Sequence, residues 1–306
     1  MARAKTANDP VAAATKLLKL SQKRFERFVT LVPKFLINDD PAIIHDLRVG
    51  SRRLQQTLRA LVEATPASRK AVRVLRNTRR ALGACRNLDV NNELIQQRAR
   101  RAQSAESRIA WEELGGQAGK RRARLVAAAR KKIAKLDLVD FIERVRKIIA
   151  PAEIDGDPAA KLEAALADSM TAWDEALRRS LKDRSVKNLH RLRIATKRLR
   201  YRAEILVEIR SVELRSKVAD LKKIQTALGD WHDRSVLLQD ASDWLTQSDF
   251  LADHPERAGS LLAAIDLERR REPEAVRSLL GLARQLRRRW DRRRAHDSTG
   301  RAKRRP

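Results

Sequence analysis

The chain has 306 residues, of which 68 are Lys or Arg and 39 are Asp or Glu, so its formal net charge is +29. So large an excess repels itself in a compact fold and indicates a polyanionic partner, with nucleic acid, an anionic membrane surface and polyphosphate as the candidates on charge alone. The single cysteine excludes an internal disulfide framework and a cysteine-built zinc site, and no apolar run approaches the roughly 18 residues of a membrane span, so no membrane insertion is expected.

Scarce helix breakers predict an all-α fold. Only 10 Gly and 9 Pro occur in the chain, while Ala, Leu, Arg, Lys and Glu are abundant, and these five residue types favour helices. Asp9-Pro10 and Asp40-Pro41 each place a capping Asp before a Pro at the first helical position, which is a typical helix start. They predict one helix that ends at about residue 32 and a second that ends at about residue 64, before Thr65-Pro66.

Glycines are expected to end or bend the helices that follow. A third helix is predicted from about residue 68 to Gly83, and a fourth segment from Asn87 to about residue 149, interrupted at Gly115-Gly116 and at Gly119. Gly83 suits a helix end with a positive φ, and Asn87 suits the N-cap of the next helix. Between residues 98 and 135 two alternatives stay open, a long exposed helix or a partly mobile segment.

The middle of the chain carries a predicted linker. Residues 151–158 are acidic and contain Pro and Gly, which predicts a break between an N-terminal helical half, residues 1–150, and a C-terminal helical half, residues 159–290. The order of features recurs after the linker, because a basic helix is again followed by a Leu-Gly pair, here Leu228-Gly229, with Asp233 as the expected N-cap. Residues 291–306 are rich in Arg and are expected to form a disordered tail.

The recurring basic helix is the strongest signal in the sequence. The first copy reads IHDLRVGSRRL from residue 44, and the second reads LHRLRIATKRLRY from residue 189. At about 100° per residue, the His and most of the cations of each copy fall on one helical face and the Leu residues on the opposite face. We call the two polar faces the first ridge and the second ridge. The first ridge contains His45, Arg48, Arg52 and Arg53, and the second contains His190, Arg193, Lys197, Arg198 and Tyr201.

This pattern resembles the CHAD family, named for its conserved histidine α-helical domain. The resemblance rests on the H-x-x-R-h-x-x-R/K-R-L core in both copies, on Arg200-Tyr201 and on the two Leu-Gly pairs. It implies an all-α fold of two four-helix bundles related by a pseudo-twofold axis, with a basic central groove or pore, and binding of inorganic polyphosphate through basic residues. At the Leu-Gly pairs the family pattern resembles L-G-x-x-R-D. Here Asn87 replaces the acid in the first copy and His232 replaces the Arg in the second, so we interpret these segments as structural.

The resulting hypothesis is a non-enzymatic, cytoplasmic protein that binds inorganic polyphosphate and associates with polyphosphate granules. No catalytic residue, metal ligand or cofactor is predicted, and the first ten residues are not followed by the apolar region of a secretory signal. Arg76 and Lys222, on the next helix of each copy, are expected to widen the basic surface. The predicted polyphosphate-binding residues are His45, Arg48, Arg52, Arg53, His190, Arg193, Lys197, Arg198, Tyr201, Arg76 and Lys222.

Three alternatives stay open. In the first, the ridges are solvated faces neutralised by Glu residues on neighbouring helices. In the second, the protein binds nucleic acid; the net charge and the Arg-rich tail fit this reading, but 4% aromatic residues leave few platforms for stacking bases. In the third, the His45-Asp46 and His232-Asp233 pairs belong to a metal-dependent phosphohydrolase, although such a site needs further His and Asp ligands and the chain has only five His.

Overall fold

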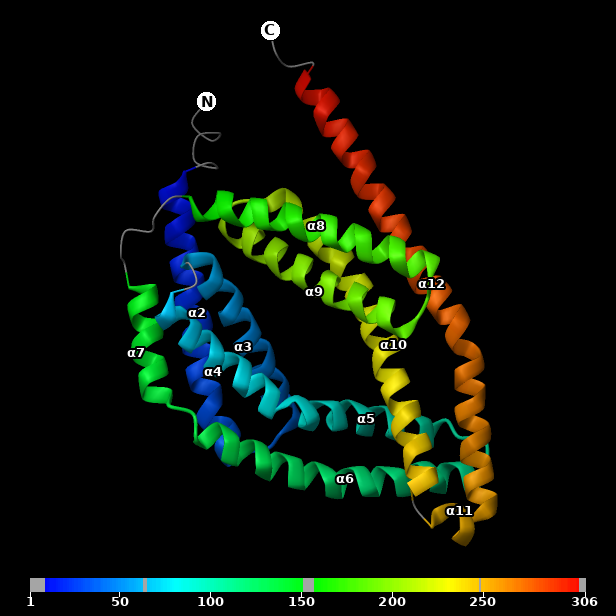
Figure 1. Cartoon of the computed structure of the whole chain (residues 1–306). Helices are drawn as coiled ribbons and strands as arrows, with labels where there is room; N and C mark the ends of the chain where they lie inside the picture. The colour runs from blue at the N-terminus through cyan, green and yellow to red at the C-terminus, as the bar shows by residue number, and fades with distance from the viewer. Residues whose placement is uncertain (1–8, 63–64, 151–156, 248, 303–306) are drawn as a thin grey trace. The chain divides into compact units, whose positions relative to one another are not determined.

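The regular structure of the protein is helical. The computed structural model describes residues 9–62, 65–150, 157–247 and 249–302, and these ranges contain no β-strand, which confirms the predicted all-α fold (Figure 1). The helices, with the labels of Figure 1, are α2 (Pro10–Ile37), α3 (Pro41–Leu61), α4 (Pro66–Ala81), α5 (Gly83–Arg100), α6 (Ala105–Ala134), α7 (Leu138–Ile149), α8 (Pro158–Lys182), α9 (Val186–Ile209), the 3₁₀ helix η2 (Val212–Leu214), α10 (Arg215–Gln247), α11 (Phe250–Asp253) and α12 (Pro255–Ala302).

The predicted helix starts are confirmed by their caps. The side chain of Asp9 accepts a hydrogen bond from the Val11 N–H at 2.9 Å, and that of Asp40 accepts one from the Ala42 N–H at 2.7 Å. These carboxylates satisfy backbone donors that have no partner within the first turn of a helix. The first helix runs further than predicted, through Pro33 to Ile37, because Phe35 on its last turn is fully buried in the core.

The first Leu-Gly pair marks a helix end as predicted, since α4 ends at Ala81 with Leu82 as its C-cap, but the second does not. Gly83 is the first residue of α5, Gly229 lies inside α10, and neither has a positive φ. Asn87 and Asp233, predicted as N-caps, both lie inside helices. Leu228 is fully buried, and its packing stabilises helical geometry on both sides of Gly229, which outweighs the modest helix penalty of Gly.

The glycines at positions 115, 116 and 119 do not break α6, which is continuous from Ala105 to Ala134. Of the two alternatives for residues 98–135, the structure therefore supports a long helix. Apolar residues such as Trp111 and Ile133 bury one face of it. A Cβ at Gly115 would lie 3.3 Å from the Ile95 side chain, so this glycine allows α6 to approach α5 closely where the two helices run side by side (Figure 1).

The residues of the chain divide into two compact units that interlace along the sequence. Unit 1 comprises Met1–Leu162, Glu208–Arg210 and Asp233–Leu267, and unit 2 comprises Glu163–Val207, Ser211–His232 and Glu268–Pro306. The halves 1–150 and 159–290, and their arrangement as two four-helix bundles, stay predictions. Most of the predicted linker, residues 151–156, lies outside the described residues.

The predicted disordered tail is helical as far as Ala302, because α12 continues through it, while residues 303–306 lie outside the described part. The tail is rich in Arg, which is a good helix former, and it continues a helix that is already anchored in the core by Leu286 and Trp290. Propagation of an existing helix needs no new nucleus.

Each unit buries the apolar face of its ridge helix. In unit 1, α2, α3, α4 and α7 share a core in which Phe28 packs edge-on against Phe141 at a centroid distance of 5.4 Å. In unit 2, α8, α9, α10 and α12 share a core in which Trp173 contacts Trp290 at 5.2 Å. Every Leu of the two repeated motifs is buried, namely Leu47, Leu54, Leu189, Leu192 and Leu199. The predicted division of both helices into a buried and a polar face is therefore confirmed.

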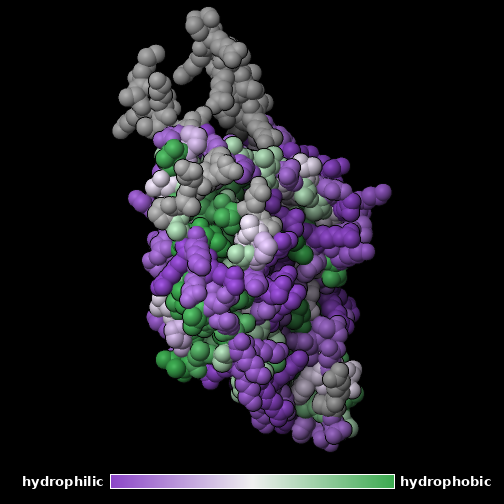
Figure 2. All heavy atoms as spheres, turned by 60° about the vertical axis from the view of Figure 1, so that its left-hand side comes forward, coloured by the Kyte–Doolittle hydropathy of each residue, from purple (hydrophilic) through white to green (hydrophobic). Residues whose placement is uncertain are grey.

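The surface is dominated by polar side chains. On the face shown in Figure 2, hydrophilic residues predominate and hydrophobic residues form smaller patches between them. None of the described helices combines the length and the apolar character that crossing a membrane requires.

One ion-pair network holds the start of α3 against α5 and α6. Arg122 of α6 donates from Nε to Asp89, whose side chain is 1% exposed, and from Nη1 to Asp39 at 3.2 Å. Hydrogen bonds and charge pairing with the two carboxylates raise the pKa of Arg122 against the opposing effect of burial, which is the largest single influence. Loss of this guanidinium would leave a buried carboxylate without a cation.

We expect Arg122→Ala to lower the free energy of unfolding by about 3 kcal/mol, because Asp89 then keeps an uncompensated buried charge. The measurement is urea denaturation followed by circular dichroism. Lys131→Ala, an exposed change on the same helix, serves as the control and should stay within about 0.5 kcal/mol of the unsubstituted protein. Adding Asp89→Asn to Arg122→Ala should recover part of the loss. Equal denaturation midpoints for Arg122→Ala and the control would contradict this account.

Candidate functional site

The first ridge lies on α3 and is partly covered by neighbouring helices. His45 is exposed, whereas Arg48, Arg52 and Arg53 are half-buried. The guanidinium of Arg48 donates from Nη1 to the backbone carbonyl of Arg79 on α4 at 2.8 Å. The ridge is therefore built into the packing of two helices and is more than a solvated face.

Arg79 adds a cation to the first ridge that the sequence analysis missed. Its guanidinium donates to the Gln55 side chain of α3, and its Nη1 is buried without a hydrogen-bond partner among the described residues. The pKa of Arg79 is lowered to about 10, chiefly by burial and then by the charges of four arginines, namely Arg52, Arg48, Arg59 and Arg76. The strongest charge effects on Arg79 thus all come from other guanidinium groups.

Such a cluster favours a bound anion. Guanidinium groups repel each other most where burial excludes water, and a phosphate among them would offset the repulsion and supply acceptors for the unused N–H groups. Arg76, predicted only to widen the surface, acts on Arg79 directly and joins the cluster, as does Arg59. Arg53 takes part less clearly, because its side chain makes no hydrogen bond or ion pair with a described residue and its carbonyl accepts from Arg24.

Arg86 lies beside the histidine of the first ridge. The pKa of His45 is lowered, chiefly because its ring is partly buried and next because of the positive charge of Arg86 on α5. Asp46 raises this pKa, and Arg48 lowers it by a smaller amount. Arg86 belongs to the segment after Leu82-Gly83 that the sequence analysis interpreted as structural. The signal that could have identified it was its agreement with the Arg of the L-G-x-x-R-D pattern.

The second ridge lies on α9, and its histidine and cations follow each other in the same order as those of the first ridge. His190 and Arg198 are exposed, and Arg193 and Lys197 are half-buried. His232 of α10 approaches the histidine of the ridge, with 5.9 Å between the ring centroids of His190 and His232. In the alignment of the two copies, His232 takes the position that Arg86 has in the first, so both ridges receive a nitrogen-bearing side chain at the matching place.

His232 is held neutral by its surroundings. Burial, and after it the positive charges of Arg193, His190 and Lys197, together lower the pKa of His232 to about 4. The neighbouring Trp231 donates its indole N–H to Glu272 of α12 at 2.8 Å, which anchors this turn of α10 in unit 2. The second ridge therefore contains a base that is neutral without an anion and becomes easier to protonate beside one.

Two of the binding residues predicted for the second copy, Tyr201 and Lys222, differ in their surroundings from the other ridge residues. Tyr201 is buried, and the guanidinium carbon of Arg200 lies 4.5 Å from the centroid of its ring. Tyr201 therefore contributes to the packing of the helix. Arg200 itself is bonded to Gln225 at 2.8 Å and Glu204 at 2.6 Å. Lys222 is exposed on α10, and no hydrogen bond or ion pair joins it to the ridge.

Among the described residues, no group of three or more His, Cys, Asp or Glu side chains is placed to hold a metal ion. Asp46, from the first His-Asp pair, forms an ion pair with Arg27 at 2.8 Å. The pairing directs its carboxylate toward a structural contact between α2 and α3.

Comparison with known proteins identifies the fold. The CHAD domain model matches residues 20–242. The CHAD domain from the plant Ricinus communis is 21% identical, with a TM-score of 0.64 over 88% of this chain and 91% of that one. PptA from Streptomyces chartreusis is 18% identical, with a TM-score of 0.62 over 89% of this chain and 99% of that one. No curated protein matches the sequence. Because the family model spans well over half of the residues, this chain belongs to the CHAD domain family.

Proposed function

We propose that the protein binds inorganic polyphosphate, without catalysis, through the first and second ridges. The observation that supports this most directly is the Arg79 cluster, where several guanidinium groups surround a partly buried guanidinium with an unused donor. Family membership supports the same ligand, since some members of the CHAD domain family bind polyphosphate. Association with polyphosphate granules would follow from this affinity.

The geometry of each ridge suits a linear polyanion. Cations one turn apart on a helix are separated by about 5 Å along its axis, so a flexible chain of phosphates can meet them in succession. Arg supplies a planar fork of donors to each phosphate, and Lys supplies a point charge. Half-burial of Arg48, Arg52, Arg193 and Lys197 restricts their rotamers before binding, which lowers the entropic cost of binding.

The second candidate is nucleic acid, favoured by the net charge of +29. Any strongly basic protein binds any polyanion at low salt, because binding releases condensed counterions. Preference at physiological salt therefore separates a geometric site from a general electrostatic attraction.

We expect long-chain polyphosphate to outcompete duplex DNA, matched in phosphate concentration, at near-physiological salt. Replacing Arg48 and Arg193 together by Glu should lower polyphosphate affinity at least 100-fold, because each ridge loses a central donor and gains a repulsive charge. The measurement is fluorescence competition with labelled polyphosphate. If DNA competes as well as polyphosphate, and the double variant keeps its polyphosphate affinity, the nucleic-acid hypothesis would be favoured.

Two further variants control this experiment. Arg100→Glu/Arg178→Glu changes the net charge equally at exposed positions outside the ridges and should reduce affinity only a few-fold. Since Arg48 also bonds to Arg79, Arg52→Gln/Lys197→Gln provides a milder pair of ridge changes. Circular dichroism should show helical spectra for all three, and release of phosphate in the presence of Mg²⁺ should be absent; metal-dependent release would support the hydrolase alternative.

Binding should strengthen as pH falls from about 7 to about 5. The free protein holds the pKa of His232 at about 4, and a nearby phosphate raises that pKa, so the complex takes up a proton that the free protein does not bind. His45, whose pKa is also lowered, contributes in the same direction. Isothermal titration calorimetry in buffers of different ionisation enthalpy measures this uptake.

His232→Arg and Arg86→His test the same coupling from both sides. His232→Arg gives the second ridge a permanent charge, so it should raise affinity at pH 7 and flatten the pH profile. Arg86→His should lower affinity at pH 7 and steepen the profile. Unchanged proton uptake in both variants would show that these two positions do not contact the anion.

A further inference from the structure

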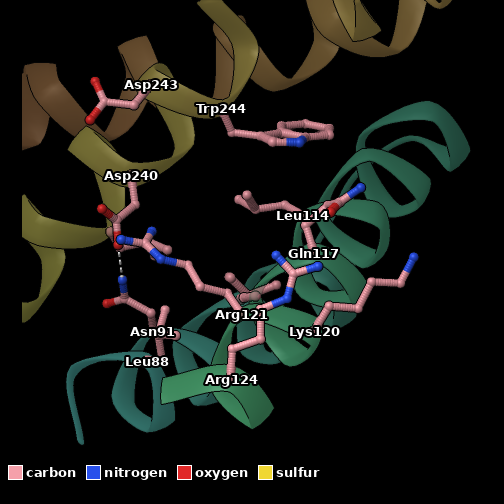
Figure 3. Close-up of a pocket in the computed structure, with 13 residues that line it drawn as sticks. Leu88, Asn91, Leu114, Gln117, Lys120, Arg121, Arg124, Asp240, Asp243 and Trp244 are labelled. Atoms are coloured by element: carbon pink, nitrogen blue, oxygen red, sulfur yellow. Dashed lines mark hydrogen bonds between the residues drawn. The ribbon is translucent and has the colours of Figure 1, made fainter. Parts of the chain in front are cut away.

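A cavity of about 520 Å³ opens in unit 1 between α5, α6 and α10 (Figure 3). No ridge residue lines it, and its volume falls within the range of small-molecule sites. Its floor is aliphatic, formed by residues such as Leu88, Ile95 and Leu114. The proposed polyphosphate site makes no use of this cavity.

One side of the cavity is cationic. Lys120, Arg121 and Arg124 extend from neighbouring turns of α6 (Figure 3). Lys120 and Arg124 are exposed and form no ion pair with a described residue, so both are available to an anionic group. Arg121 points toward Asp240 and lowers the pKa of that carboxyl, although burial, which raises it, is the larger effect.

The other side is acidic and aromatic, and α10 supplies it. Asp240 accepts a hydrogen bond from the Asn91 amide at 2.5 Å, and Asp243 lies one turn further along. Trp244 borders the same space and packs against Phe250 of α11 with 4.3 Å between ring centroids, which restricts the indole. This edge therefore combines carboxylate acceptors with a large planar surface whose orientation is set by packing.

The two sides together select a particular kind of ligand. The carboxylates of Asp240 and Asp243 would repel a bare phosphate chain. They already accept hydrogen bonds from the side-chain amides of Asn91 and Gln239, but an apolar ligand would leave Lys120 and Arg124 without an anionic partner. A nucleotide satisfies both sides, since its phosphate is anionic, its base is planar and an amino group on the base donates hydrogen bonds to carboxylates. We propose that this cavity binds a purine nucleotide, with the phosphate at Lys120 and Arg124, the base beside Trp244 and its amino group at Asp240 or Asp243.

AMP is the appropriate probe, because its single phosphate interacts least with the ridges. Isothermal titration calorimetry at near-physiological salt should give saturable 1:1 binding of AMP. Adenosine and ribose 5-phosphate should each bind at least ten-fold more weakly, since each lacks one of the two recognised ends. Absence of saturable AMP binding, or equal binding of ribose 5-phosphate, would overturn the proposal.

Variants locate the site. Lys120→Gln/Arg124→Gln and, separately, Asp243→Asn should each weaken AMP binding at least five-fold, and both change exposed or half-buried side chains that the fold tolerates. Trp244→Leu should weaken AMP binding more than either of these changes. Lys131→Gln/Lys132→Gln removes the same charge from an exposed part of α6 outside the cavity and should leave AMP affinity unchanged.

The ridge variant Arg52→Gln/Lys197→Gln separates this proposal from the proposed function. It should retain AMP binding while losing polyphosphate affinity. AMP binding that is lost in the ridge variant and kept in the cavity variants would assign the nucleotide to the ridges and reject the cavity.

Discussion

Burial of a leucine stripe is the constraint on which both ridges depend. Each ridge helix carries Leu residues on the face opposite its cations, and Leu47, Leu54, Leu192 and Leu199 are fully buried. Because a helix cannot rotate without exposing that stripe, the cations stay in register even though they repel each other. The hydrophobic core thus holds charges together that would separate on a free helix, and an anion can bind them with little rearrangement.

The arginines of this protein differ in the groups that surround them, and the directions of their pKa shifts reflect this difference. Arg122 and Arg287 are paired with carboxylates, and these partners raise their pKa values. Arg79 has its pKa lowered by burial and by surrounding cations. The first two stabilise the packing of helices, whereas burial and the neighbouring cations destabilise the charged form of Arg79. This contrast supports a local binding function over a general role for the net charge.

The two ridges have the same spacing of a histidine and cations, but they differ at one neighbouring titratable position. The repeat places Arg86 beside His45 in one unit and His232 beside His190 in the other. An Arg keeps its charge at every physiological pH, whereas His232 gains its charge only when an anion or acid compensates the neighbouring cations. If the second ridge binds an anion, it is therefore expected to take up more protons than the first, so that the two ridges respond differently to pH.

The sequence by itself determined the helical class, the helix starts at Asp9-Pro10 and Asp40-Pro41, and the two-faced character of the ridges, because caps and 3.6-residue periodicity are local properties. Family membership was likewise readable from the repeated His and cation spacing. The helix end near Gly83 was predicted correctly, but the one at Gly229 was wrong, because whether a glycine ends a helix depends on the packing of distant residues.

Only the tertiary structure decided which residues join each site. Arg79, Arg86 and His232 are supplied by neighbouring helices, and the cavity beside Trp244 brings together α6 and α10, whose positions along the chain are far apart. Side-chain burial and the mutual effects of charges arise from such nonlocal contacts, and a pattern read along one helix cannot contain them.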